Sequence, residues 1–282
     1  MSRTKTQDIP DLSALLMPQN QLMLAVERAV LRGGQEWSHA AAPVAEQIAA
    51  RLAGVITLDL VHAGQRLLEQ DISDVLHVSR APVREALRIL ERDRLVEFQP
   101  RRGAIVTAPS AQDLRDIFVV RSALYAILLR QVMDERPADL DAVFKEHMPR
   151  LAGAVEESAE AYAVASFLLN FAVSELCSNR LLKDLNQSLS LRTLRYVRLG
   201  LASGQTLISG SVKAWRALHK AVAKRDIEQV VAMAARRIDD TRDAALRALD
   251  APRAAGIKPT SAAAAGPAPR GKRSRPASTT PA

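Results

Sequence analysis

The order of short helices and tight turns in residues 43–109 leaves little choice of fold. Apolar side chains recur at helical spacing in three short runs, which polar connections separate. Two β-forming segments follow, and the turn between them contains Pro100 and Gly103. These helices and strands are predicted at residues 44–56, 68–76, 80–92, 95–98 and 104–107. Three helices followed by a two-stranded hairpin predict a winged helix-turn-helix.

The third helix of this segment has two chemically different faces. Ser79 stands at its N-cap, where a hydroxyl can accept a hydrogen bond from an otherwise unpaired amide. Pro82 falls in the first turn, where a missing N–H costs nothing. The apolar set of this helix is Val83, Leu87 and Leu90, and the cationic set is Arg80, Arg84 and Arg88. The pattern predicts one packed face and one cationic face.

The charge of the whole chain says little about its partner. The formal net charge is +8, but the segment after Asp250 has six basic residues and no acidic one. Residues 43–109 carry nine arginines and nine acidic residues, so their net charge is zero. The placement of the charges therefore matters more than their sum, because three arginines line one helix face and Arg101 and Arg102 lie in the hairpin turn.

This placement of arginines favours DNA as the partner. An arginine on a helix in the major groove can bind guanine through two hydrogen bonds, and arginines at a wing tip suit phosphates or a narrow minor groove. Any one of these arginines alone is better explained as a solvated surface charge. Together with the cap and the hairpin, they predict a DNA-reading segment.

Three motifs in this segment resemble the GntR family of bacterial regulators. They are Gly64-Gln-Arg-Leu67, Val78-Ser-Arg-Ala-Pro-Val-Arg-Glu-Ala-Leu87, and Leu95-Val with Pro100-Arg-Arg-Gly103. From the resemblance and the arginine stripe, the predicted DNA contacts are Ser79, Arg80, Ala81, Pro82, Arg84, Arg88, Arg101, Arg102 and Gly103. His77 and Arg94 stand where such sequences usually have glycine, so we expect a positive φ at His77.

Residues 110–250 are helical in pattern almost throughout and predict an all-α bundle of about six helices. Breaks are expected near Pro137, Pro149, Asn179 and Ser203-Gly204. Residues 113–121 and the closing helix near Arg225-Asp226 resemble the FCD domain of the FadR-like branch of the GntR family, which implies effector binding and dimerisation. The chain is thus predicted to be mainly α.

The two ends of the chain complete the predicted organisation. Residues 1–42 form an N-terminal extension with an amphipathic helix that ends at Gly33-Gly34. Residues 251–282 are rich in alanine, proline and serine, and we expect a disordered basic tail. The predicted domains are therefore 1–42, 43–109, 110–250 and 251–282.

The resemblance also raises the question of a metal site. Many FCD domains hold a divalent metal through an Asp, a His four residues later and two further His. The corresponding positions here are Leu168, Ala172, Trp215 and Arg237, none of which is a usual ligand. We therefore expect no metal and no other cofactor.

We expect an apolar cavity in place of the metal site. Arg121 shares a helical stripe with Leu114 and Ile117, so its guanidinium points inward, where it needs an anion. A bound carboxylate and a protein acid, Asp116 or Glu175, are both candidates for that anion. Arg237 either supplies a counter-charge or is solvated. The spacing of Arg192, Arg195 and Arg198 favours a solvated basic face over a pocket. The predicted effector-binding residues are Arg121, Leu168, Ala172, Arg195, Tyr196, Trp215 and Arg237.

Other functional classes find little support in the sequence. The single cysteine, Cys177, excludes an internal disulfide and the usual thiolate zinc motifs and is expected to be a buried thiol. No segment resembles a membrane span, a signal peptide, a nucleotide-binding loop or a nucleophile elbow, so we expect no membrane partner, no enzyme and a cytoplasmic location, on the nucleoid when DNA-bound.

We therefore predict a transcriptional repressor that binds a double-stranded DNA operator as a homodimer. Its operator affinity is expected to respond to a small organic effector, with a carboxylate favoured. Two alternatives stay open: a nonspecific DNA-coating protein that uses the basic tail, and a regulator that has lost its effector response.

Overall fold

The computed structural model describes Leu12, Leu16 and residues 21–33, 43–108, 110–202 and 204–250. The predicted basic tail lies outside these residues. The described part is mainly α, and none of its helices has the length and apolar character needed to cross a bilayer.

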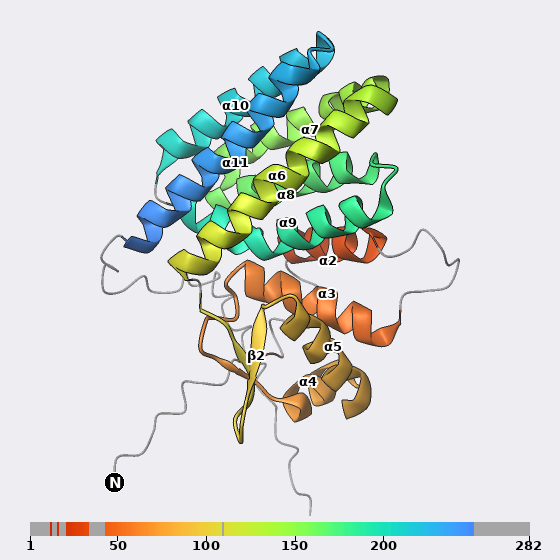
Figure 1. The fold of residues 1–282 in the computed structure, drawn as a ribbon. Helices are drawn as coiled ribbons and strands as arrows, with labels where there is room; N and C mark the ends of the chain where they lie inside the picture. Colours follow the sequence, from red (N-terminus) through yellow and green to blue (C-terminus); the bar gives the residue numbers. More distant parts are fainter. Residues whose placement is uncertain are drawn as a thin grey trace, which may run out of the picture. The chain divides into compact units, whose positions relative to one another are not determined.

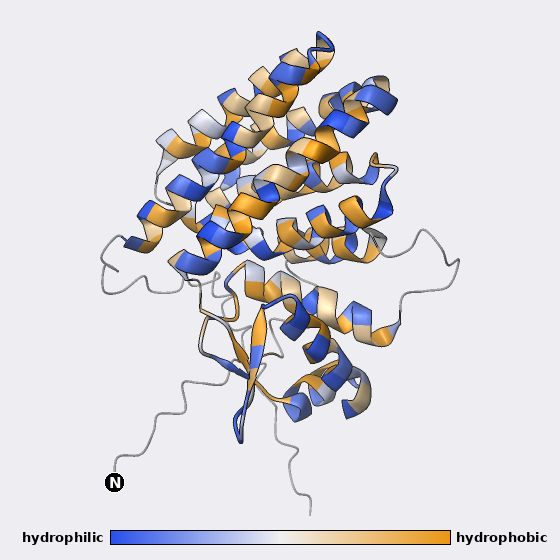
Figure 2. Ribbon diagram, in the orientation of Figure 1, coloured by the Kyte–Doolittle hydropathy of each residue, from blue (hydrophilic) through white to orange (hydrophobic). Residues whose placement is uncertain are grey.

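Residues 43–106 form the predicted winged helix-turn-helix. The elements are α3 (Val44–Thr57), β1 (Arg66–Leu67), α4 (Glu69–Leu76), α5 (Arg80–Arg92), β2 (Val96–Gln99) and β3 (Gly103–Val106). β3 lies in the middle of an antiparallel sheet of order β1-β3-β2, in which Glu97 pairs with Ile105 and Arg66 pairs with Ile105 from the other side. The tip of the hairpin between β2 and β3 is hydrophilic (Figure 2).

The strand β1 was not expected, because the sequence predicted only a turn at its position. Two residues are too short to show an alternating pattern. The strand forms because its backbone hydrogen-bonds to the free edge of β3. Next to it, the Gly64 amide donates to the Val106 carbonyl over 2.8 Å, and the Val106 amide donates to the Gln65 carbonyl over 2.9 Å. This pairing ties the loop after α3 to the base of the wing.

The turn that joins α4 to α5 has the expected backbone. His77 ends α4 with φ of 53°, which confirms the positive φ predicted there, and Arg94 has φ of 55°. Ser79 occupies the N-cap of α5 with extended backbone, but its side chain makes no capping hydrogen bond. The predicted position of the cap is right and the predicted hydrogen bond is wrong, so the helix start depends on backbone geometry and on Pro82.

Six helices of the described chain form the predicted bundle (Figure 1). Side-chain caps begin three of them: Ser110, Ser158 and Asn179 each accept a hydrogen bond from the amide three residues later, over 2.9–3.1 Å. α6 packs against α9 and along α11, and α7 packs against α8 and α10. The bounds are α6 (Ala111–Glu135), α7 (Pro137–Glu157), α8 (Ala159–Glu175), α9 (Arg180–Leu201), α10 (Gln205–Ala223) and α11 (Ile227–Asp250).

One predicted break in this region is wrong. Pro149 lies inside α7, whereas the chain breaks at Ser158, where no break was predicted. A proline removes one hydrogen bond from a helix interior, in this case the bond to the carbonyl of Lys145. Both Lys145 and Pro149 are exposed, so water can bind that carbonyl, while Phe144 and Leu151 remain buried and hold the helix in place.

The predicted N-terminal helix is present as α2 (Gln21–Gly33) and is part of the core. It packs against α3 and also against α8 and α9. Met23 and Val26 are fully buried, and a side chain at Gly54 of α3 would meet Met23 at 3.0 Å. Glu27, which is also buried, pairs with Arg51 of α3 over 3.0 Å. This helix therefore joins the winged segment to the bundle.

Candidate functional sites

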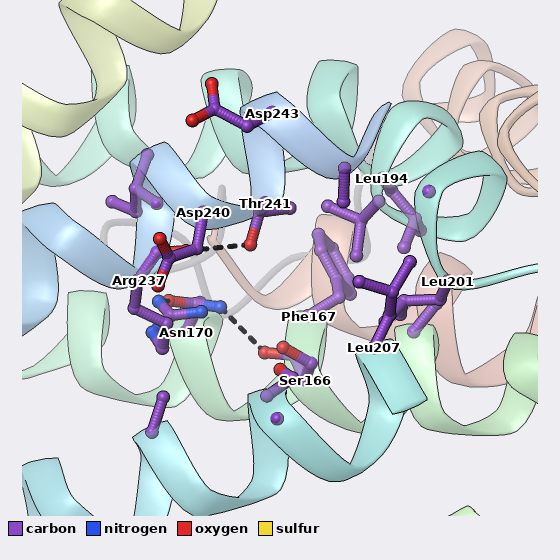
Figure 3. Close-up of a pocket in the computed structure, with 18 of the residues that line it drawn as sticks. Ser166, Phe167, Asn170, Leu194, Leu201, Leu207, Arg237, Asp240, Thr241 and Asp243 are labelled. Atoms are coloured by element: carbon purple, nitrogen blue, oxygen red, sulfur yellow. Dashed lines mark hydrogen bonds between the residues drawn. The ribbon is translucent and has the colours of Figure 1, made fainter. Parts of the chain in front are cut away.

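The bundle contains a cavity of about 330 Å³ that is polar on one side and apolar on the other. Asn170, Arg237 and Asp240 lie on the polar side in Figure 3. The side chains opposite them are Phe167, Leu194, Leu201 and Leu207. The lining comes from α6, α8, α9, α10 and α11, so the cavity depends on the packing of the whole bundle.

Arg237 of α11 is one of two buried cations beside this cavity. Its side chain is 6% exposed, its Nη2 donates to Asn170 Oδ1 over 2.9 Å, and its guanidinium lies 3.8 Å from the centre of the Trp215 ring. The Nε atom has no hydrogen-bond partner among the described residues. Burial lowers the pKa of Arg237. Of the two alternatives that the sequence left open for Arg237, a counter-charge inside the bundle or a solvated side chain, the buried position excludes the solvated one.

Arg121 of α6 is the second buried cation and is 5% exposed. It donates to the hydroxyl of Thr193 on α9, which itself donates to the Leu189 carbonyl over 2.8 Å. Burial, together with the positive charge of Arg237, lowers the pKa of Arg121 to about 9. Both its inward orientation and its place in the cavity lining agree with the sequence prediction.

Neither buried arginine has an acidic partner within the described residues. Asp116 accepts a hydrogen bond from Gln112 on the surface, and Glu175 binds Gln187 and Lys183, so neither acid proposed from the sequence neutralises Arg121. A buried charge without a counter-charge costs folding free energy. Arg121 and Arg237 are thus buried cations without an ion pair among the described residues, beside a cavity whose lining also contains the carboxylates of Asp240 and Asp243.

The positions that correspond to the metal ligands do not fit a metal ion. Leu, Ala, Trp and Arg supply no carboxylate, imidazole or thiolate, and no cluster of metal-ligating side chains occurs in the described chain. Trp215 and Arg237 instead stack on each other. Leu168, Ala172 and Trp215 do not line the cavity, which corrects the prediction for them. The side of α8 that lines the cavity carries Ala163, Ser166, Phe167 and Asn170.

Arg195 and Tyr196, also predicted for the cavity, lie elsewhere. They line a second hollow of about 290 Å³ near the base of the wing. Arg195 is 8% exposed and binds Thr107, with Nη2 donating to the carbonyl over 2.8 Å and Nη1 lying 3.3 Å from the hydroxyl. Arg198 pairs with Asp59 over 2.9 Å. This side of α9 contacts the winged segment, so it neither lines the 330 Å³ cavity nor forms a solvated basic face.

The helix α9 therefore contacts both the cavity and the winged segment. Ser190, Leu194 and Val197 line the cavity, while Arg195 and Arg198 bind Thr107 and Asp59 in the winged segment. A shift of α9 on ligand binding would move both sets of residues, because one rigid helix carries them.

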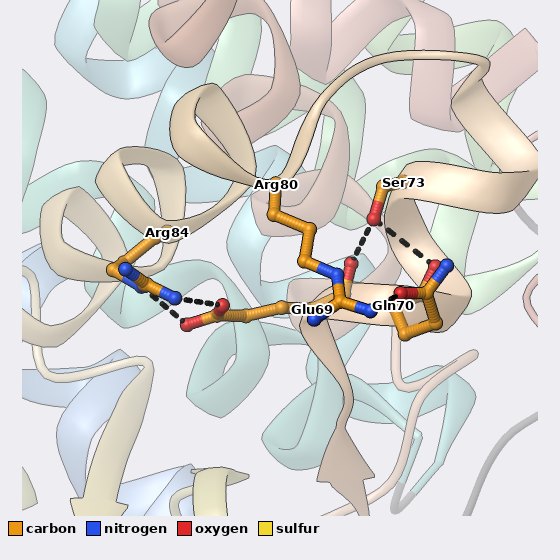
Figure 4. A network of polar contacts seen from close by, with 5 residues as sticks. All are labelled: Glu69, Gln70, Ser73, Arg80 and Arg84. Atoms are coloured by element: carbon orange, nitrogen blue, oxygen red, sulfur yellow. Dashed lines mark hydrogen bonds and ion pairs between the residues drawn. The ribbon is translucent and has the colours of Figure 1, made fainter.

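The cationic face of α5 is exposed, as predicted, and its arginines have partners within the protein. Arg84 makes two hydrogen bonds to Glu69, of 2.9 and 2.8 Å, and Arg80 binds Gln70 (Figure 4). The bond from Arg84 lowers the pKa of Glu69. Arg88 pairs with Glu91 over 2.7 Å. The side chains of Arg84 and Arg88 are 63% and 60% exposed, so these ion pairs lie at the surface.

The remaining predicted contacts lie around this face and at the wing tip. Ser79 and Ala81 are exposed at the start of α5, and Pro82 is half-buried. Arg101, Arg102 and Gly103 are all exposed at the tip. The positive φ of 63° at Arg101 and 76° at Gly103 makes the tight turn, and Arg66 donates to the Arg102 carbonyl over 2.9 Å.

Sequence reasoning missed most of the cavity lining and also the polar partners Glu69, Gln70, Thr193 and Asn170. Glu69 and Gln70 bind Arg84 and Arg80 of α5, but these partners follow fifteen and ten residues later, respectively, and no local pattern marks them. Likewise, no pattern in the sequence around Thr193 predicts that it binds Arg121. Asn170 gave a signal that went unused, since an amide within the apolar run 167–171 is a buried polar group that needs a partner.

Comparison with known proteins agrees with this architecture. Residues 44–106 match the family described as bacterial regulatory proteins, gntR family, and residues 116–240 match the FCD domain. The HTH-type transcriptional regulator YdhC of Bacillus subtilis is 29% identical over 34% of this chain and 43% of its own length. The HTH-type transcriptional repressor RspR of Escherichia coli is 34% identical over 32% of this chain and 39% of its own.

The aligned segments thus span less than half the length of these two curated relatives. A crystal structure of a GntR transcriptional regulator from Rhodococcus sp. RHA1 superposes with a TM-score of 0.61 at 24% identity. It covers 74% of this chain and 99% of the Rhodococcus chain, so the two share a fold over both regions. The matched families and relatives are transcriptional regulators, not enzymes.

Proposed function

The chain belongs to the GntR family of bacterial regulatory proteins and carries an FCD domain, and we propose that it is a sequence-specific transcriptional repressor. It binds a double-stranded DNA operator as a homodimer, and a small organic carboxylate in the bundle lowers its operator affinity. One observation carries the effector half of the proposal: Arg121 and Arg237 are buried beside one cavity with no acidic partner among the described residues.

For operator binding, α5 enters the major groove with Arg80, Arg84 and Arg88 toward the bases and phosphates, and the wing tip contacts the neighbouring backbone. The internal partners of these arginines are no obstacle. A surface ion pair contributes only about 0–1 kcal/mol, so guanine or phosphate can replace Glu69 and Glu91 at little cost.

For the effector, the shape of the cavity favours an amphipathic monocarboxylate. Its carboxylate binds Arg121 and Arg237, where charge-assisted hydrogen bonds neutralise two buried cations. Its apolar body, aromatic or branched aliphatic, packs against Phe167, Leu194 and Leu207. A neutral ligand would leave both charges unpaired, and a compact dianion would leave the apolar side empty.

The helix α9 carries the effect of the ligand to the DNA-binding half. The carboxylate pulls Arg121 toward the cavity, and Arg121 is bonded to Thr193 of α9. The same helix holds Thr107 and Asp59 through Arg195 and Arg198. Release of DNA follows when α9 moves, and the name repressor for the E. coli relative RspR favours this direction of control over activation.

The DNA half is tested by titrating the full chain into the DNA upstream of its own gene and into scrambled DNA of equal length. At physiological salt we expect a preference of about a thousandfold or more for the native sequence, as specific regulators show. A preference below about tenfold would favour nonspecific coating and contradict the proposal.

The effector half is tested by thermal-shift measurement with a series of aromatic and branched aliphatic monocarboxylates. The matched control for each acid is its primary amide, which keeps the shape and removes the charge. We expect stabilisation by some acids and none by their amides. Equal stabilisation by acid and amide, or silence across the series, would count against the arginine site.

A further inference from the structure

The cavity of the bundle carries an acidic side chain that neither the fold nor a plain carboxylate ligand uses. Asp240 of α11 lines this cavity and is exposed. Its side chain makes no hydrogen bond or ion pair with the described residues. The two other acids of this part of α11, Asp239 and Asp243, both bind Arg242 over 2.9 Å. Among the described residues of this stretch, Asp240 is therefore the carboxylate left without a partner.

Asp240 lies close to the buried positive charge of the cavity. It follows Arg237 by three residues, and side chains at this spacing are neighbours on one face of a helix, about 5–6 Å apart at Cβ. Arg237 turns toward Asn170 and Trp215, so it does not pair with Asp240. Both charged side chains lie on the polar side of the cavity in Figure 3. The polar side therefore offers a cation and an anion that are adjacent but not paired with each other.

A second hydrogen-bond acceptor stands next to Asp240. Thr241 also lines the cavity, and its hydroxyl donates to the Arg237 carbonyl over 2.8 Å, so its oxygen can still accept a hydrogen bond. An ammonium group has three N–H donors and no acceptor. A carboxylate and a hydroxyl oxygen on adjacent residues of the cavity wall are suitable acceptors for such donors.

We propose that the cavity recognises an α-amino acid with an aromatic or branched aliphatic side chain, whose carboxylate binds Arg121 and Arg237 and whose ammonium group binds Asp240. This inference rests on the proposed function, because it names the class of carboxylate that the same cavity binds. The two charged groups of an amino acid are attached to one carbon atom. They therefore fit opposite charges that lie on neighbouring positions of one helix face.

The charges of the lining favour a zwitterion over a ligand with a single charge. A plain carboxylate leaves Asp240 beside the negative charge of the ligand, and a plain amine leaves both buried arginines unpaired. The other charged residues of the lining lie outside this region. Asp243 binds Arg242, and Arg247 follows Asp240 by seven residues, about 10 Å further along α11. Because the arginines are buried and Asp240 is exposed, the ligand enters with its carboxylate inward.

Isothermal titration calorimetry on the full chain tests this inference with matched trios of ligands. L-Phenylalanine is compared with 3-phenylpropanoate, which lacks the amino group, and with 2-phenylethylamine, which lacks the carboxylate. L-Leucine is compared in the same way with 4-methylpentanoate and 3-methylbutylamine. In at least one trio, the amino acid should bind about tenfold or more tightly than the acid, because it adds a charge-assisted hydrogen bond, and the amine should not bind.

Asp240→Asn removes the charge that distinguishes these ligands. In this variant the amino acid should lose its advantage and bind within about threefold of the acid, while the acid should bind no more weakly than to the parent chain. Asp240 is exposed, so the variant should keep the melting temperature of the ligand-free parent. Asp239→Asn is the matched control, because this neighbouring acid does not line the cavity, and it should keep the tenfold preference.

The outcomes separate this inference from the proposed function. If an acid binds and its amino acid binds no more tightly, or if Asp240→Asn keeps the preference, the inference is wrong and the carboxylate site stands. If an amine binds as tightly as its amino acid, the arginines do not hold the ligand and both assignments are wrong. If neither the acids nor the amino acids bind, the effector half of the proposed function fails and takes this inference with it.

Discussion

At the scale of single residues, the arginines of this chain fall into two groups that differ in their surroundings. Arg84 and Arg88 are exposed and paired with acids at the surface, whereas Arg121 and Arg237 are buried and have only neutral partners. Exposed pairs exchange partners at small cost because water solvates every intermediate arrangement. A buried cation without a counter-charge costs free energy, and a bound anion would lower that cost. The first group suits DNA contact and the second suits recognition of a small anion.

Arg84→Ala should greatly weaken operator binding without changing the fold. A bidentate contact to guanine contributes about 1–3 kcal/mol of discrimination, and a two-fold dimer loses it in both half-sites. Stability should change by less than about 1 kcal/mol, because the pair with Glu69 is at the surface. Fluorescence anisotropy with labelled operator measures the first effect and urea unfolding the second. Arg216→Ala, at an exposed arginine of α10, is the control. Unaltered operator affinity in Arg84→Ala would refute the assignment of α5 as the reading helix.

Arg121→Met should abolish the carboxylate response and leave the free protein as stable as before or more stable, by up to about 4 kcal/mol. Methionine removes a buried charge, and Thr193 keeps its hydrogen bond to Leu189. The pKa of Arg121 is lowered to about 9 by burial, so the unfolded chain binds the proton more tightly than the folded chain does. The folded chain therefore bears the full cost of the charge below pH 9, and its stability recovers only as the pH rises from there toward the ordinary pKa of an arginine.

The readout for this variant is chemical unfolding at pH 7 with and without a monocarboxylate that stabilises the parent chain. Arg216→Met is the control and should shift stability by no more than about 0.5 kcal/mol. A large loss of stability in Arg121→Met would show that the arginine serves the fold and would remove the argument for an anion.

At the scale of elements, α9 is a helix whose two sides contact different parts of the molecule. One side lines the cavity and the other binds the winged segment through Arg195 and Arg198. α5 contrasts with it, since one of its sides packs and the other meets solvent. A helix packed on both sides, such as α9, can pass a movement from one site to the other. A helix with one side in solvent, such as α5, can only offer its exposed residues to a partner.

Arg195→Ala should uncouple the effector from the operator. The variant loses two contacts to Thr107 but none to the cavity, so ligand should still raise its melting temperature. Operator affinity without ligand should stay within about threefold of the parent, and the ligand-induced decrease should shrink from the five- to 150-fold typical of allosteric coupling toward none. Lys213→Ala, at an exposed position of α10, is the control. A full ligand response in Arg195→Ala would rule out this route.

At the scale of the whole molecule, α2 adds a second connection between the winged segment and the bundle, beside the contacts that α9 makes with the winged segment. It contacts α3 of the winged segment and both α8 and α9 of the bundle, and its buried residues belong to the common core. The pair between buried Glu27 and Arg51 adds a polar contact at this junction. A helix in this position favours unfolding of both halves together.

Removal of residues 1–33 should split the unfolding of the chain. The parent is expected to melt in a single calorimetric transition, and the truncated chain in two, because its halves lose the helix that joins them. Met23→Ala is a milder version that should lower the unfolding free energy by about 2–5 kcal/mol, as loss of a buried methionine side chain does. Differential scanning calorimetry measures both, and a single unshifted transition in the truncated chain would show that α2 is dispensable.

The sequence by itself determined the features that depend on local pattern. Periodic apolar residues, turn residues and caps specify α3, α4, α5 and the wing within a residue or two, and the positive φ at His77 follows from the turn it occupies. The inward orientation of Arg121 was also predictable, since it shares an apolar stripe on α6. These features need only neighbours in the chain, so their physical cause can be read in a short window.

Tertiary structure alone decided which residues meet across distant segments. α8 is buried on nearly all sides along residues 161–167, so no stripe marks the side that lines the cavity, and Leu168 and Ala172 were wrongly placed there. Arg195 binds Thr107, Arg84 binds Glu69 and β1 pairs with β3, and each of these contacts forms only when elements far apart in sequence pack together. A local pattern fixes the existence of a helix, but its rotation and its partners are fixed only when the other elements pack against it.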